Sequence, residues 1–261
     1  MGHEYMKIPK DSVIAMFEHA REKAPEECCG LILKVGRKVS YWPCANAAAD
    51  PKADFRISAE DWAEAEDLGV VAAVVHSHPG QSARLSAADR TSMEATALPW
   101  VIIEVREGLP VSHLVHEPTG YQAPLVGRPF HHGVLDCYTL VRDYYQRELG
   151  ITLPDFERED GWWDKGQDLY AENFDGAGFY PVDPADLRQG DLIVMQVRAQ
   201  KANHAGVYLA DGILKTEPEH YPVPGGILHH LYGRDSKRDV FGGFWRESAR
   251  FYMRHKDSPY G

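Results

Sequence analysis

The sequence of 261 residues predicts an α/β domain followed by an α+β domain. In the first part of the chain, helical patterns alternate with short apolar runs, and side chains of the metal-ligand type follow one of these runs. In the second part, a single amphipathic helix precedes several strand-like runs. Prolines and glycines interrupt the pattern between the two parts and place the domain boundary near residue 120: Pro118, Gly120, Pro124, Gly127, Pro129 and Gly133.

The composition is that of a folded, acidic protein. Hydrophobic residues make up 44% and charged residues 26%, which excludes an intrinsically disordered chain. A net charge of −11 excludes the basic surface that nucleic acid or an anionic membrane would bind. The longest apolar stretch, 70–75, is too short to span a bilayer, and segment 1–10 lacks the apolar core of a signal peptide. We expect a soluble protein made in the cytoplasm.

The four cysteines do not form a disulfide pattern. Cys28 and Cys29 are adjacent, so on a strand their side chains point to opposite faces of a sheet. The remaining two, Cys44 and Cys137, stand alone, and no pair has C-x-x-C spacing. We expect at least one free thiol, which fits a reducing compartment.

The first domain begins with an amphipathic helix over 11–24, capped by Asp11 or Ser12 and ended by Pro25. A short buried strand over 30–35 comes next, and Glu27 stands at its entrance. Four further elements follow in order: a helix over 58–68 with a Ser cap, a strand over 70–75, a helix over 86–97 and a strand over 100–105.

The second domain opens with a helix over 137–149, for which Gly150 is the expected C-cap. A long aromatic and acidic segment separates this helix from the predicted sheet. The strand-like runs lie at 192–197, 205–209 and 227–232.

The first candidate site is of the zinc hydrolase type. His76 and His78 are two residues apart on an extended segment, so both rings point to the same side, and Asp89 on the next helix can fold back to them. Two imidazoles and a carboxylate leave the fourth position of Zn²⁺ open for a water molecule. Glu27 would then act as the general base, and Ser86 would donate to the oxyanion.

Each of these residues also has a simpler interpretation. Ser86 and Asp89 stand three apart at a helix start, which is a capping arrangement. A His-x-His pair is common on protein surfaces, and Glu27 alone is most simply a solvated charge.

The second candidate site is of the cysteine peptidase type. Cys137 follows Asp136 at the start of a helix, where the positive end of the dipole is expected to lower the thiol pKa. His204 stands at the start of a strand, and His229 and His230 lie on the next strand-like run. A nucleophilic thiolate needs one histidine for proton transfer and a third group that orients it. The simpler interpretation is an inert thiol and ordinary half-buried histidines.

The first set of motifs resembles the JAMM family of zinc isopeptidases and peptidases, which has the cytidine-deaminase-like MPN fold. All signature positions are filled: Glu27-x-Cys29-Gly30, His76-x-His78-Pro79, Ser86 and Asp89. The resemblance implies a catalytic zinc and the hydrolysis of amide or isopeptide bonds, with Glu27 as the base.

The second set resembles the NlpC-type papain-like cysteine peptidases, which cleave the peptide stems of the bacterial cell wall. The matching segments are Asp136-Cys137, Gly190-Asp191-Leu192 and His204-Ala205-Gly206-Val207-Tyr208. The resemblance implies a site of a Cys, a His and a third polar residue, often His.

The third position is less clear than the first two. In that family it falls about a dozen residues after the first His, where this chain has Thr216. We interpret 217–226 as an insertion, which makes His229 the third residue and His230 the alternative. Tyr138 departs from the Ser that many members have after the Cys.

The combination of both domains resembles the tail-tip proteins of long non-contractile bacteriophage tails, of the lambda tail assembly K type. Further matching segments are the linker 124–130, the run 136–145, the pair 162–163 and the end segment 229–245. The expected domains are then 1–118 of the JAMM type, a linker over 119–132, and 133–261 of the NlpC type.

This resemblance implies a component of the virion that is assembled in the host cytoplasm. Its expected partners are other tail-tip proteins and peptidoglycan, which it would open during genome entry. The alternatives are a structural tail-tip subunit whose sites are silent or gated by assembly, and a maturation protease that trims another tail protein.

Overall fold

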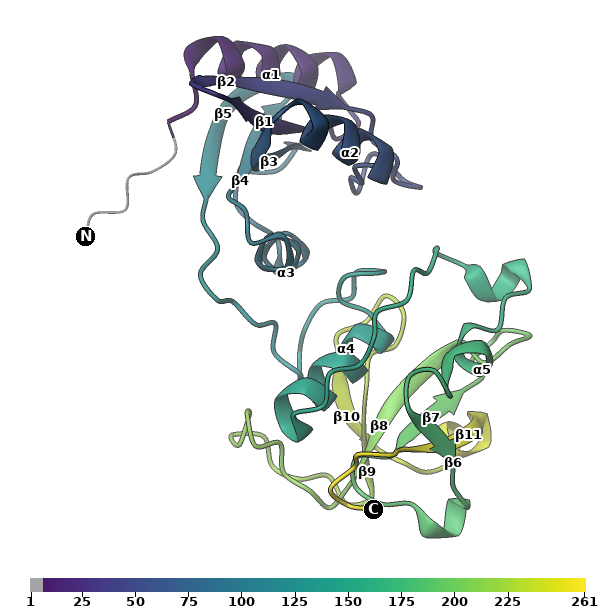
Figure 1. Ribbon diagram of the computed structural model, residues 1–261. Helices are drawn as coiled ribbons and strands as arrows, with labels where there is room; N and C mark the ends of the chain where they lie inside the picture. Colours follow the sequence, from purple (N-terminus) through teal and green to yellow (C-terminus); the bar gives the residue numbers. More distant parts are fainter. Residues whose placement is uncertain (1–6) are drawn as a thin grey trace. The chain divides into compact units, whose positions relative to one another are not determined.

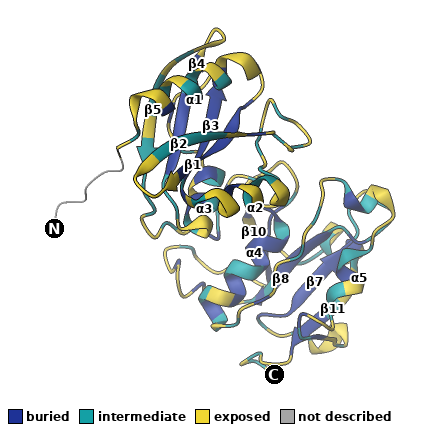
Figure 2. Ribbon diagram, turned by 45° about the horizontal axis from the view of Figure 1, so that its top comes forward, coloured by how far each residue is buried: buried dark blue, intermediate teal, exposed yellow. Residues whose placement is uncertain are grey.

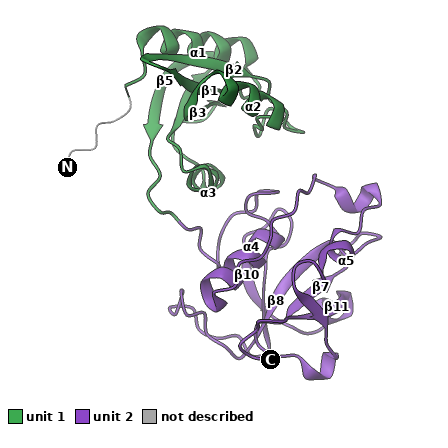
Figure 3. Cartoon of the chain, viewed as in Figure 1, with its two compact units in different colours: residues 1–121 green, residues 122–261 purple. Residues whose placement is uncertain are grey.

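A computed structural model describes residues 7–261 as two compact units, Met1–Tyr121 and Gln122–Gly261, here called unit 1 and unit 2 (Figures 1 and 3). Residues 1–6, which belong to the segment in which the sequence indicates no signal peptide, lie outside the described residues. Within 7–261, no helix is both long and apolar enough to cross a bilayer.

Unit 1 is a five-stranded sheet in the order β2-β1-β3-β4-β5 with helices on both faces. The pair β3–β4 is parallel and the other pairs are antiparallel. The elements are α1 (Lys10–Lys23), β1 (Cys29–Val35), β2 (Lys38–Cys44), α2 (Ala59–Leu68), β3 (Val70–Pro79), α3 (Ala87–Thr96), β4 (Trp100–Arg106) and β5 (Leu109–His116). The predicted α/β class is confirmed.

Two hydrophobic cores lie on opposite faces of this sheet. Met16 of α1 packs on one face together with Cys28, whereas Met93 of α3 packs on the other together with Cys29. The two adjacent cysteines therefore do point to opposite faces, and all four thiols of the chain are free. Figure 2 shows the central strands buried and the edge strands β2 and β5 partly exposed.

Two details of unit 1 differ from the prediction. Helix α1 begins after Pro9 without a side-chain cap, so neither Asp11 nor Ser12 caps it. Strand β3 continues to Pro79, because it pairs with β4 along its whole second half. His76 and His78 therefore lie within a central strand rather than beyond its end.

Gly30 of β1 is the position in unit 1 where a side chain has least room. A Cβ atom there would lie 2.5 Å from the backbone oxygen of Trp42 and 2.5 Å from the Tyr41 ring. We expect Gly30→Ala to lower the free energy of unfolding of unit 1 by about 1–3 kcal/mol, because the paired strand cannot yield. Denaturant unfolding measures this loss. Gly176→Ala, in unit 2, where the nearest atom is 3.8 Å away, is the control and should leave the free energy of unfolding of unit 1 unchanged.

Unit 2 is built on a six-stranded antiparallel sheet in the order β10-β9-β8-β7-β11-β6. Its helices and strands are α4 (Cys137–Tyr144), α5 (Leu169–Asn173), β6 (Phe179–Pro181), β7 (Leu192–Met195), β8 (His204–Ala210), β9 (Gly226–His229), β10 (Lys237–Val240), α6 (Phe244–Ser248) and β11 (Ala249–His255). The predicted α+β class is confirmed. A π-helical turn, Tyr145–Leu149, extends α4 up to the left-handed Gly150, which is the predicted C-cap.

Helix α4 packs on one face of this sheet. Val141 and Tyr144 are fully covered there, in one core with Val207 of β8 and Leu228 of β9. The amino end of α4 therefore places Cys137 at the edge of this core. The strands on which α4 packs, β8 and β9, carry His204 and His229.

The segment 122–132, predicted as part of a linker, is anchored to unit 2. The buried Glu217 carboxylate accepts hydrogen bonds from the backbone N–H groups of Leu125 and Val126. The fully buried Arg128 forms an ion pair of 2.6 Å with Asp143. This part of the segment is thus packed structure, while the bounds of the linker stay a prediction.

Candidate functional sites

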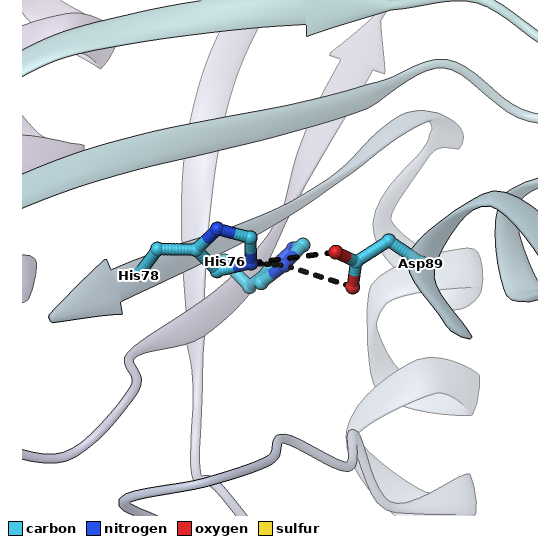
Figure 4. Close-up of side chains that lie close together, drawn as sticks. All are labelled: His76, His78 and Asp89. Carbon is cyan, nitrogen blue, oxygen red and sulfur yellow. Dashed lines mark hydrogen bonds and ion pairs between the residues drawn. The ribbon is translucent and has the colours of Figure 1, made fainter. Parts of the chain in front are cut away.

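The metal-type residues converge in unit 1. His76 and His78 project from β3 toward Asp89 on the first turn of α3 (Figure 4). The two Nε2 atoms are 2.9 Å apart, and they lie 3.3 Å and 3.4 Å from the Asp89 carboxylate oxygens. All three side chains are buried. The sequence-predicted ligands are therefore brought together.

These distances allow a test of whether the residues fit a zinc ion. Around a tetrahedral ion with bonds of about 2.0–2.1 Å, ligand atoms lie roughly 3.3 Å apart. The two nitrogen–oxygen separations are close to that value, and the nitrogen–nitrogen separation of 2.9 Å is somewhat shorter. The His78 Nδ1 atom lies 3.0 Å from the Ser82 carbonyl oxygen, to which it can donate, leaving Nε2 as the lone-pair nitrogen. Donor set and spacing thus fit zinc with one position left open.

Ser86 and Asp89 also form a reciprocal capping box at the start of α3. The Asp89 carboxylate accepts from the Ser86 N–H at 2.7 Å, and Ser86 Oγ accepts from the Asp89 N–H at 3.0 Å. The capping interpretation is confirmed and does not compete with the metal one. Capping orients the Asp89 carboxylate and leaves the hydroxyl proton of the exposed Ser86 free to donate.

Glu27 is buried, with 7% of its surface exposed, so the interpretation as a solvated charge is wrong. Burial raises the pKa of Glu27 to about 8, against the opposite influence of His78. The Asn46 amide holds this loop by donating to the backbone oxygens of Glu27 and Asp54, at 3.0 and 2.9 Å. A carboxyl group with a raised pKa can both take up and release a proton near neutral pH.

In unit 2, Cys137 is the first residue of α4 and Asp136 is its cap. The Asp136 carboxylate accepts from the Thr139 N–H at 2.9 Å and pairs with Arg158 at 2.7 Å. The Cys137 sulfur lies 3.4 Å from the Tyr170 hydroxyl. Burial and, after it, the Asp136 carboxylate raise the pKa of Cys137. The predicted lowering by the helix dipole is therefore wrong, because desolvation and a neighbouring negative charge outweigh it.

The histidines form a chain on one face of the sheet. His204 Nε2 lies 3.2 Å from His229 Nδ1, and His229 Nε2 lies 3.2 Å from an Asp239 oxygen. His230 points elsewhere: its ring packs edge-on against Phe130, with ring centroids 5.2 Å apart. Of the two candidates for the third position, His229 is the one that contacts His204.

A cavity of about 510 Å³ opens beside this site. Cys137, His204 and His230 line it, whereas His229 lies behind His204 and does not. Much of the remaining wall is aromatic, with basic side chains interspersed: Phe130, Phe156, Trp162, Trp163, Tyr232, Phe244, Arg158, Arg198 and Arg234. A concave apolar pocket of this size that contains a thiol and an imidazole has the features of a ligand site.

Four buried histidines make unit 2 sensitive to acid. Burial lowers the pKa values of His204, His229 and His255, and it lowers that of His230 to about 4. Below pH 6.5 the unfolded chain binds protons that the folded chain refuses, so the free energy of unfolding falls by up to about 1.4 kcal/mol per pH unit for each histidine. For His230 this window runs from about pH 6.5 down to about 4.

We therefore expect the Tm of unit 2 to decrease as the pH is lowered from 7 to 5. Calorimetry measures this decrease. In His230→Leu the fall should be shallower, because one titrating group is gone. Equal slopes in the variant and the wild type would contradict this assignment.

The chain is similar to known proteins over both units. Residues 9–114 match the family of prokaryotic homologues of the JAB domain, and residues 127–253 match the NlpC/P60 family. Tail tip assembly protein K of Escherichia phage N15 is 38% identical over 94% of this chain and 95% of its own length. Tail tip assembly protein K of Escherichia phage lambda is 37% identical over 77% of this chain and 89% of its own length.

Among solved structures, the chain is similar to a protein from Desulfitobacterium hafniense, with 26% identity over 41% of this chain and 87% of that chain and a TM-score of 0.32. The two phage proteins, by contrast, are matched over nearly their whole length, across both the JAB and the NlpC/P60 regions. This chain therefore belongs to the family of the tail tip assembly proteins K, in which a JAB domain precedes an NlpC/P60 domain.

Proposed function

We propose that this protein is a tail-tip component of a bacteriophage and a peptidoglycan hydrolase that cleaves amide bonds of cell-wall stem peptides. Cys137, His204 and His229 form the proposed cysteine site. A second, zinc-dependent peptidase or isopeptidase site is proposed at His76, His78 and Asp89. The proposed domains are 1–118 and 133–261, with a linker over 119–132.

The names of the relatives support the tail-tip role, and the NlpC/P60 match supports a peptidase. We place the protein in the virion after assembly in the host cytoplasm, with other tail-tip proteins as partners. Opening of the wall would serve genome entry. The observation that carries the enzymatic part is the pocket that Cys137 and His204 share, with His229 bonded behind His204.

In the proposed cysteine reaction, His204 takes the proton of the Cys137 thiol as the sulfur attacks the amide carbonyl carbon. The His204 nitrogen free for this step is Nδ1, because Nε2 faces His229. The raised pKa of Cys137 and the lowered pKa of His204 keep the resting pair neutral, so proton transfer accompanies attack. The Cys137 N–H at the helix start helps to hold the oxyanion. His204 then protonates the leaving amine, and water hydrolyses the acyl-enzyme.

In the proposed zinc site, His76, His78 and Asp89 would hold the ion. A zinc ion held there would supply Lewis-acid chemistry, which would acidify a water molecule and polarise an amide carbonyl. Glu27 takes a proton within the site and delivers it to the leaving amine, a role that its buried position favours. The Ser86 hydroxyl donates to the developing oxyanion.

Digestion of purified sacculi by the intact protein tests the proposal, with released muropeptides identified by mass spectrometry. Wild type, Cys137→Ala and Glu27→Gln are run side by side. Stem-peptide fragments that disappear in Cys137→Ala but persist in Glu27→Gln assign wall cleavage to the cysteine site. The substrate of the zinc site would then be sought among tail proteins, by comparing their masses in phage carrying wild type or Glu27→Gln.

The word assembly in the names of the relatives favours one alternative, a structural subunit with silent sites. Sacculi that stay intact with every version, together with normal infection by phage carrying Cys137→Ala, would establish that alternative.

A further inference from the structure

We propose that Asp239 is a positioning residue of the cysteine site, which fixes the tautomers of His229 and, through it, of His204. The inference rests on the proposed function, since it adds Asp239 as a fourth residue to the proposed site of Cys137, His204 and His229. It is carried by strand register and by the contacts of one carboxylate oxygen.

Strand register places the three side chains in a row. Gly206 of β8 is the partner of His229 of β9, and His204 lies two residues before Gly206, on the same face. Lys237 of β10 is the partner of His229, and Asp239 lies two residues further along, again on that face. Diagonal neighbours at this spacing are within reach of long and aromatic side chains.

The Asp239 carboxylate determines which ring nitrogen of each histidine is the hydrogen-bond donor. An ionised carboxylate accepts and cannot donate, so His229 Nε2, at 3.2 Å from Asp239, must carry the proton. His229 Nδ1 is then the lone-pair nitrogen, and His204 Nε2, 3.2 Å away, must donate to it. His204 is thereby left with a lone pair on Nδ1, the nitrogen that does not face His229. Without Asp239, either imidazole can take the other tautomer, and in the wrong one His204 Nδ1 carries a proton and cannot accept the thiol proton.

Asp239 is itself held in place and kept ionised. The same oxygen that faces His229 accepts from Trp245 Nε1 at 3.2 Å and from the Lys237 ammonium at 2.8 Å. The Trp245 ring packs on His229 with centroids 4.2 Å apart. Against the effect of partial burial, Lys237 and His229 lower the pKa of Asp239. The side chain of Asp239 is 27% exposed, so its replacement leaves no sealed cavity.

The first test reads the tautomers directly and needs no peptidase substrate. Nitrogen-15 NMR of the full chain, labelled at histidine, distinguishes protonated from lone-pair ring nitrogens. In the wild type we expect Nε2–H on both His204 and His229. In Asp239→Ala we expect mixed tautomers at both rings. Lys237→Gln removes the ammonium group that pairs with the Asp239 carboxylate but keeps Asp239, so it should retain the wild-type tautomers.

The second test is kinetic. We expect Asp239→Ala to lower kcat on sacculi by about tenfold to a hundredfold with KM unchanged. Part of the molecules then hold His204 in the unreactive tautomer, and the Asp239 charge no longer stabilises the imidazolium that forms during attack. Asp239→Asn, whose amide oxygen can still accept from His229, should recover part of the rate. A residue with a purely structural role would instead lower Tm without this split between kcat and KM.

The two proposals fail in distinguishable ways. If wild type releases fragments and Asp239→Ala matches its rate and its tautomers, the role of Asp239 is overturned while the cysteine peptidase stands. If wild type releases none, the proposed function fails, and the tautomers of Asp239→Ala alone decide: a mixed pattern supports the assignment to Asp239, and an unchanged pattern overturns it.

Discussion

Replacing Cys137 by Ala is expected to abolish the release of stem-peptide fragments from sacculi, lowering the rate by about 10⁴-fold or more. The sulfur is the proposed nucleophile, and the described residues that line the shared pocket include no second cysteine and no serine, threonine or lysine. The fold should survive, because thiol hydrogen bonds are weak, and the contact of the Cys137 sulfur with the Tyr170 hydroxyl is as long as 3.4 Å. The measurement is the initial rate of muropeptide release, with Tm recorded for both proteins.

Cys44→Ala is the matched control for this experiment. It also removes one thiol, but from a buried position in unit 1 rather than from the pocket. It should therefore keep the full rate. Cys137→Ala protein that digests sacculi as fast as the wild type would rule out the cysteine mechanism, whatever its stability.

Zinc is expected to bind one equivalent per chain and to stabilise unit 1. At a free zinc concentration 100 times Kd, binding to the folded state contributes about 2.7 kcal/mol, which is about 10 °C in Tm for a domain of this size. The two donor nitrogens are 2.9 Å apart, and each lies within 3.4 Å of an Asp89 carboxylate oxygen, so binding needs little rearrangement. Titration calorimetry gives the stoichiometry, and scanning calorimetry with zinc or a chelator gives the shift in Tm.

Two variants make this result specific to the site. Asp89→Ala should lose both binding and stabilisation, whereas Glu27→Gln should retain both, because Glu27 is the proposed base and no ligand. An equal Tm shift in wild type and Asp89→Ala would place the zinc elsewhere on the chain.

Helices and strands with a clear hydrophobic pattern could be predicted from the sequence, whereas strands made largely of polar or half-exposed residues could not. β3 and β4 are continuous apolar runs, which their central position explains. Edge strands β2 and β5 alternate weakly and are half exposed, so no clear period marks them. Strand β10 reads Lys-Arg-Asp-Val and pairs at the edge of its sheet, where charged residues are common.

This explains why Asp239 was missed although His229 was predicted. His229 lies on a strand-like apolar run and could be found there, but Asp239, the carboxylate behind it, belongs to a strand without a hydrophobic signal. The alternating pair Lys237-x-Asp239 was the available hint. The pKa of Cys137 was mispredicted for a related reason, because burial and the capping role of Asp136 depend on packing that one sequence does not reveal.

Strand β3 lies in the middle of its sheet, hydrogen-bonded to β1 on one side and β4 on the other, whereas Asp89 stands on the first turn of a ten-residue helix. Amide protons of the central strand are therefore expected to exchange with deuterium only through global unfolding, and those at the start of α3 through local opening as well. An ion held by both elements would couple them. With metal bound, exchange at the amide of Asp89 should become slower, while the amide of His76 should still exchange only through global unfolding. The comparison of these two amides would then report metal occupancy residue by residue.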